Sequence, residues 1–107
     1  MNRLAIALAA SFSLSAFAAG EPEFSLVIEG NKFTPDRIEV PAGKKVKINI
    51  ENKDNAAEEF ESNELKIEKV IPARGKGVVF VGPLKAGEYK FVDEFHEKTG
   101  QGKIIAK

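Results

Sequence analysis

The chain has 107 residues, 43% of them hydrophobic, and its 16 basic and 16 acidic side chains give a formal net charge of zero. Neither sign gathers in a long block, so nucleic-acid binding and docking on an anionic membrane find no support. The length suits one domain with a modest core, and because the chain has no cysteine that core must hold by hydrophobic packing alone.

The first residues predict a secretory signal peptide over 1–18. Arg3 provides a positive n-region, residues 4–14 form an apolar run, and Ala16-Phe17-Ala18 is a small-x-small cleavage pattern. A membrane anchor is the competing interpretation, but serines interrupt the run, which is shorter than the roughly 20 residues that a spanning helix needs. We therefore expect a periplasmic protein whose mature domain, residues 19–107, has no membrane span.

Along the mature chain the apolar residues recur with a period of two. Residues 24–28 and 46–50 alternate between apolar and polar side chains, which is the pattern of a half-buried strand. Shorter strand signals lie at 38–40, 66–71, 77–81, 89–93 and 103–106. Turn residues such as Gly30-Asn31 and Gly82-Pro83 separate them. About seven or eight short strands at this spacing predict an all-β protein, an antiparallel Greek-key sandwich.

Residues 54–69 carry mixed signals. Ala56, Ala57 and the glutamates that follow favour a helix locally, whereas Phe60, Leu65 and Ile67 show no clear period. We expect an irregular loop there, with room for one helical turn. The aromatic residues expected in the core are Phe33, Phe80, Tyr89 and Phe91, with Phe95 either in the core or an apolar screen beside the histidine.

The only histidine, His96, lies between the last two expected strands, three residues after Asp93. Small β-sandwiches build metal sites on such loops. Blue-copper proteins place cysteine and histidine at the two positions occupied here by Asp93 and His96. Whatever this site does, it does without a thiolate.

The order of these segments resembles a cupredoxin. The first half of the resemblance comprises residues 29–35, 38–40, 42–43, 46–50 and 52–54, and the second half comprises 87–91, His96 and 102–105. Each piece alone is a common β pattern, but their order and spacing together are specific. The resemblance covers nearly the whole mature chain and implies a cupredoxin-like fold.

The departures from the blue-copper pattern bear on function. Where that pattern has its first histidine this chain has Glu58 or Glu59, its cysteine position is Asp93, and the only methionine is Met1. A trigonal His₂Cys electron-transfer centre is therefore impossible on this sequence.

The chain resembles more closely the cupredoxin-like domains of bacterial periplasmic iron-uptake systems, of the EfeO or FtrB type. The matching residues are Glu58-Glu59-Phe60-Glu61-Ser62, Leu65, Glu68-Lys69, Gly82-Pro83-Leu84 and the late Asp93-x-x-His96. The resemblance implies a protein that works beside an inner-membrane iron permease, binds copper or iron, and assists iron oxidation or delivery.

Carboxylate oxygens and one imidazole suit Cu(II) or iron in a type 2 site, rather than Cu(I). The expected metal ligands are Glu58, Glu59, Asp93 and His96, of which the adjacent glutamates would point opposite ways on an extended segment, so that only one faces the site. The count from Asn52 favours Glu58 and the Glu-Phe-Glu-Ser pattern favours Glu59, so both stay open. Glu61 and Glu97 are weaker candidates.

Simpler interpretations compete with a metal site. A glutamate cluster is usually a solvated surface, and a lone histidine near a strand end is more often a surface residue than a ligand. Three classes of function therefore stay open. The first is a metal-binding accessory of iron uptake, which could also assist the oxidation of ferrous iron with copper. The others are a copper chaperone or tolerance protein and a metal-free interaction module. The sequence does not support nucleophilic hydrolysis, because Ser62 has no histidine base in its own loop and no Gly-x-Ser-x-Gly motif is present.

Overall fold

The computed structural model describes residues 20–107, and the predicted signal peptide, residues 1–18, lies outside them. The described residues form nine strands and one 3₁₀ turn: β1 (Glu23–Glu29), β2 (Lys32–Thr34), β3 (Arg37–Val40), β4 (Val46–Asn52), β5 (Glu58–Ser62), β6 (Ile67–Ile71), β7 (Lys76–Val81), β8 (Gly87–Asp93), η1 (Glu94–His96) and β9 (Gln101–Ala106). Within residues 20–107 no helix is long and apolar enough to cross a membrane.

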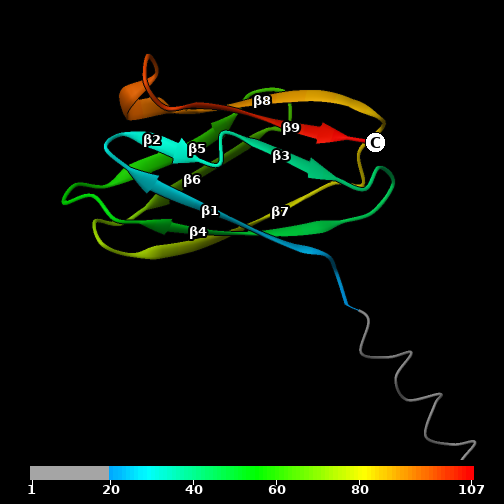
Figure 1. Ribbon diagram of the computed structural model, residues 1–107, viewed down its shortest axis with the longest axis horizontal. Coiled ribbons are helices and arrows are strands. Elements are labelled where there is room, and N and C mark those ends of the chain that lie inside the picture. The colour runs from blue at the N-terminus through cyan, green and yellow to red at the C-terminus, as the bar shows by residue number, and fades with distance from the viewer. Residues whose placement is uncertain (1–19) are drawn as a thin grey trace, which may run out of the picture.

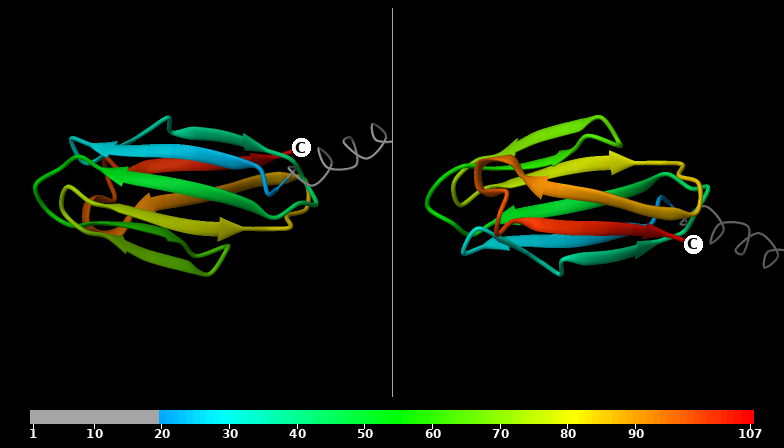
Figure 2. Two further views of the ribbon diagram at one scale, coloured as in Figure 1. Left: turned by 90° about the horizontal axis from the view of Figure 1, so that it is seen from below. Right: turned by 90° about the horizontal axis from the view of Figure 1, so that it is seen from above.

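The strands pack as two facing sheets, which confirms the all-β sandwich expected from the sequence (Figure 1). One sheet has the order β2-β1-β4-β7 and the other the order β3-β9-β8-β5-β6. The two views of Figure 2 face one sheet each. The period of two accounts for the core: in β4 the side chains of Val46, Ile48 and Ile50 are buried between the sheets, and Lys47 and Asn49 between them are only partly covered.

The prediction of an irregular loop over 54–69 is wrong, because β5 and the start of β6 lie within it. β5 pairs with β6 on one side and with β8 on the other, and these tertiary contacts override the local helix preference. The alternation of apolar and polar residues could not be recognised in β5, because the polar side chains of Glu58, Glu59 and Ser62 are buried there. β2 is the other strand that the pattern did not predict.

Two strand pairs are parallel, whereas the sequence suggested an antiparallel sandwich. β1 runs parallel to β4, with Leu26 opposite Ile50, and β3 runs parallel to β9, with Ile38 opposite Ile104. The chain crosses between the sheets before it returns to a neighbouring position, so these partners are not joined by hairpins. Apolar period alone carries no information about which strand lies beside which.

Three phenylalanines form the aromatic part of the core. The rings of Phe60 and Phe91 stack at a centroid distance of 4.8 Å, and Phe33 meets Phe91 edge-on at 4.9 Å. Tyr89 is partly buried against this core. The expectation of a buried Phe80 is wrong, since its side chain lies on the outer face of β7 and is 48% exposed beneath Lys45. Phe95 is likewise exposed and lies outside the core.

Truncating two phenylalanines tests this arrangement. Phe60→Ala should lower the free energy of unfolding by about 3 to 5 kcal/mol, because it removes a fully buried ring and leaves a cavity. Phe80→Ala, the matched change at a half-exposed ring, should cost under about 1 kcal/mol. Urea unfolding followed by circular dichroism measures both. Equal losses would contradict the assignment of Phe80 to the outer face.

Candidate metal site

The candidate site lies at one end of the sandwich. The β1–β2 turn, the β4–β5 loop and η1 gather there, at the left of Figure 1, and the C-terminus lies at the opposite end. Asp93 ends β8, His96 ends η1, and Glu58 begins β5. Loops at one end of a rigid sandwich are a common place for a functional site.

The short 3₁₀ turn sets Asp93 and His96 on one side. Asp93 is the N-cap of η1, and its Oδ1 accepts a hydrogen bond from the Phe95 N–H at 3.0 Å. Residues three apart eclipse one another in a 3₁₀ helix. His96 therefore returns over Asp93, with its Nδ1 3.4 Å from Asp93 Oδ2. Gly100 closes the following loop against this turn, and a Cβ there would lie 2.6 Å from Asp93 Cβ.

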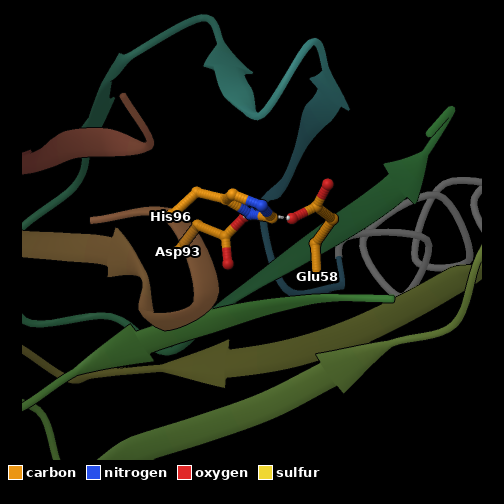
Figure 3. Close-up of side chains that lie close together, drawn as sticks. All are labelled: Glu58, Asp93 and His96. Atoms are coloured by element: carbon orange, nitrogen blue, oxygen red, sulfur yellow. Dashed lines mark hydrogen bonds and ion pairs between the residues drawn. The ribbon is translucent and has the colours of Figure 1, made fainter. Parts of the chain in front are cut away.

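Glu58 completes the group from the neighbouring strand (Figure 3). Its Oε1 lies 2.8 Å from His96 Nδ1. The register explains this approach: Phe60 on β5 is opposite Asp93 on β8, so β5 begins beside the point where β8 turns into η1. The carboxylates of Glu58 and Asp93 and the imidazole of His96 thus converge from two strands and a turn.

Two of these three side chains are fully buried. Glu58 and Asp93 are both 0% exposed, and Glu58 Oε2 has no hydrogen-bond partner among the described residues. The His96 side chain is 37% exposed and is the member that solvent reaches. Within residues 20–107, neither carboxylate is paired with a lysine or arginine.

Burial without a basic partner makes the Glu58 carboxylate costly. Desolvation, together with the neighbouring carboxylates of Asp93 and Asp54, raises the pKa of Glu58 to about 9. With no metal bound, this raised pKa favours the protonated form of the Glu58 carboxyl, whose Oε1 contacts His96 Nδ1 at 2.8 Å.

A network of polar side chains positions the loop that leads to Glu58. The buried Asn52 amide donates to the carbonyl oxygens of Ala56 and Ile71 at 2.9 and 3.1 Å, and its Oδ1 accepts from the Asp54 N–H at 2.8 Å. The Asp54 carboxylate accepts from the N–H groups of Gly30 and Asn31 at 2.8 and 3.0 Å. These backbone donors, led by Asn31, and the nearby Glu58 hold the pKa of Asp54 below its ordinary value.

The structure brings three of the four expected ligands together and separates the fourth. Glu58, Asp93 and His96 offer ligand atoms within 4.8 Å of one another. Glu59 points to the other face of β5, where the Glu94 side chain and burial raise its pKa to about 7. Glu61 joins Glu59 there and Glu97 belongs to neither group. Asp54 lies beside Glu58 and was not predicted from the sequence. It follows Ile48 by six residues, in a polar turn, and nothing in that pattern distinguishes it from an ordinary turn residue.

The chain belongs to the cupredoxin-like domain family, whose model matches residues 2–106. An uncharacterised protein of Rickettsia prowazekii (strain Madrid E) is 39% identical over 83 residues, which cover 78% of this chain and 66% of that protein.

Solved structures share the fold at low identity. An apo copper binding protein matches with a TM-score of 0.73 and 22% identity over 83% of this chain and 90% of that one. Auracyanin A, a blue copper protein of Chloroflexus aurantiacus, matches with a TM-score of 0.70 and 15% identity over 82% and 100% of the two chains. The metal binding domain of the Cu(I)-exporting ATPase CopA of Streptococcus pneumoniae D39 has a TM-score of 0.70 and 18% identity over 79% and 84%.

The distances within the group fit a metal ion. Ligands about 2 Å from an ion, at tetrahedral or octahedral angles, lie about 2.8 to 3.4 Å from one another. His96 Nδ1 lies 2.8 Å from Glu58 Oε1 and 3.4 Å from Asp93 Oδ2. Glu58 Oε2, which has no hydrogen-bond partner within residues 20–107, is a further acceptor on the same carboxylate.

Glu58→Gln should flatten the pH dependence of stability in the metal-free protein. The folded pKa of about 9 lies above the ordinary value of 4.5, so the folded state keeps a proton that the unfolded state releases. The free energy of unfolding therefore falls as the pH rises through this window. Glutamine does not titrate, and the variant should lose this part of the slope and exceed wild type in stability at about pH 8.

Urea unfolding at about pH 5 and about pH 8 measures the slope. Glu88→Gln, at an exposed position on β8, is the control for loss of a carboxylate and should behave as wild type. A slope that Glu58→Gln leaves unchanged would show that Glu58 is ionised in the folded protein.

Two substitutions of Asp93 separate its structural role from its charge. Asp93 Oδ1 accepts from the buried Glu59 N–H as well as from Phe95, each at 3.0 Å. Asp93→Ala leaves both donors without this acceptor, which costs about 1 to 3 kcal/mol for the buried Glu59 N–H and less for the part-buried Phe95 N–H. Asp93→Asn keeps a carbonyl oxygen at that position and should stay much closer to wild type. Thermal unfolding of both metal-free variants is the test, and equal losses would refute the double acceptor role.

Proposed function

We propose that this protein binds Cu(II) or iron through Glu58, Asp93 and His96 in the bacterial periplasm, as an accessory of an iron-uptake system that delivers iron to an inner-membrane permease. One observation carries the metal proposal. Two fully buried carboxylates face one imidazole at ligand distances, with no lysine or arginine beside them among residues 20–107. Buried charges of this kind are ordinarily paired or coordinate a metal.

The donor set favours Cu(II) or iron over Cu(I). Carboxylate oxygens and imidazole nitrogen suit the harder ions, whereas Cu(I) prefers thiolate and thioether sulfur. The chain has no cysteine, and its single methionine is Met1. A Cu(II) ion held here would have type 2 character and, when bound, would supply a one-electron acceptor for ferrous iron.

The iron-uptake role is supported by the motif that carries the site. The resemblance to EfeO- and FtrB-type domains runs through Glu58-Glu59-Phe60-Glu61-Ser62 and Asp93-x-x-His96, and the site residues lie within these two segments. His96 is partly exposed at the end of the sandwich, where an ion can enter or leave. Co-purification with an iron permease from periplasm and inner membrane would support the partner.

A copper carrier is the second candidate, and the likeness to the CopA metal binding domain, which was solved with Cu(I), favours it. The two candidates differ in the ion they select. A carrier for an exporter of that kind must hold Cu(I), which the oxygen-rich group of this chain suits poorly. Tighter binding of Cu(I) than of Cu(II) would therefore favour the carrier, and no binding of either ion or of iron would leave an interaction module.

Cu(II) titration of the purified protein tests the site. Glu58→Gln, Asp93→Asn and His96→Ala should each weaken Cu(II) binding by at least about tenfold, since each removes a ligand. Glu88→Gln, at an exposed position on β8 outside both carboxylate groups, is the control for loss of one acidic side chain and should leave the affinity within about twofold. Affinity should also fall as the pH is lowered, because protons compete for the ligands.

The optical and electron paramagnetic resonance spectra of the Cu(II) form check the same assignment. Without a thiolate the protein should be pale, with type 2 copper parameters. An intense blue colour, or unchanged affinity in all three ligand variants, would contradict the proposed site. Iron titrations with the same variants show whether iron uses these residues.

A further inference from the structure

A second group of carboxylates lies on the face of β5 opposite the first site. It consists of Glu59 and Glu61 on β5, Glu68 on β6 and Glu94 at the start of η1. One oxygen from each lies within 4.8 Å of the others. The group shares no residue with Glu58, Asp93 and His96.

Strand register brings the four residues together. Glu61 and Glu68 are directly opposite in the β5–β6 pair. Phe60 is opposite Asp93 in the β5–β8 pair, so Glu94, one residue further on, comes beside Glu59. Glu59 and Glu61 are two apart and share a face. The carboxylates thus come from three neighbouring segments, β5, β6 and the start of η1.

This arrangement is unfavourable unless something neutralises it. Like charges directly opposite on neighbouring strands destabilise a sheet, and Glu61 faces Glu68 in that way. None of the four carboxylates forms an ion pair with a basic side chain in the described part of the chain. An exposed acidic cluster would simply be solvated, but here one member is withdrawn from water.

That member is Glu59, and its burial points to a ligand. The residue is only 7% exposed, and its Oε1 is buried without a hydrogen-bond partner among the described residues. A buried carboxylate oxygen without a partner costs several kcal/mol if it stays unpaired. It is also the inner member of the group, while Glu68 and Glu94 form the exposed rim.

We propose that Glu59, Glu61, Glu68 and Glu94 form a second metal site, selective for a hard multivalent cation that prefers oxygen ligands. The class includes Fe(III), Mn(II), Ca(II) and the trivalent lanthanides, which bind clusters of carboxylates without nitrogen or sulfur ligands. The site differs from the first in having no imidazole. The two sites lie back to back, because Glu58 and Glu59 point to opposite faces of the same strand.

Titration of the metal-free full chain with Tb(III) chloride, a hard trivalent probe, tests the proposal. Calorimetry should give a site that Glu68→Gln and Glu94→Gln each weaken by at least about tenfold. Both positions are exposed, so these variants should fold as wild type does. Glu59→Gln should also weaken binding, and it should not lower the stability of the metal-free protein, because it removes the charge of a buried carboxylate.

Two controls keep the test specific. Glu97→Gln removes one exposed acidic charge directly after η1, outside the group, and should leave Tb(III) affinity within about twofold. His96→Ala, which disables the first site, should likewise leave Tb(III) binding intact, so failure of one site is distinguishable from failure of the other. The proposal is overturned if Glu68→Gln and Glu94→Gln have no effect, if Glu97→Gln weakens binding equally, or if His96→Ala abolishes it.

Discussion

One carboxylate, that of Asp93, holds together the elements on which the candidate site depends. Its Oδ1 accepts hydrogen bonds from the N–H groups of Glu59 on β5 and Phe95 in η1, which fixes the position of the 3₁₀ turn against the neighbouring strand. Its Oδ2 remains directed at His96. The same side chain therefore caps the turn, joins β8 to β5 and supplies an oxygen to the site. Because Asp93 accepts from two backbone donors, one of them buried, the histidine three residues later has little freedom.

Successive side chains of β5 point to opposite faces of the sheet, and this alternation separates its acidic residues. Glu58 points between the sheets, toward Asp93 and His96, and Glu59 points to the opposite face, toward Glu94. Phe60, the next residue on the inner face, stacks on Phe91 and anchors the strand in the core. A slip of one residue would exchange the two glutamates and expose the phenylalanine, so the packing of one ring determines which glutamate meets the histidine.

Buried carboxylates that have no lysine or arginine partner within residues 20–107 define the chemistry available at the candidate site. A blue-copper centre binds its ion through thiolate and imidazole, whereas the candidate site of this chain offers two carboxylates and one imidazole. Desolvation raises the pKa of Glu58 to about 9, and the Glu94 side chain together with burial raises the pKa of Glu59 to about 7, which favours bound protons in the metal-free state. A metal that binds these groups must displace those protons, so occupancy and pH are coupled on both faces of β5.

The sequence by itself determined the features that depend on short spacings. The period of two established the all-β sandwich, the composition excluded a thiolate site, and the three-residue separation of Asp93 and His96 placed them on one turn. Only the tertiary structure placed Glu58 rather than Glu59 beside His96, formed β5 where a loop was expected, made two strand pairs parallel, and gathered Glu61, Glu68 and Glu94 around Glu59. The physical reason is that spacing along a chain is a local property. Register between strands is set by which side chains pack in the shared core, and the buried polar residues of β5 concealed that pattern until their partners were in place.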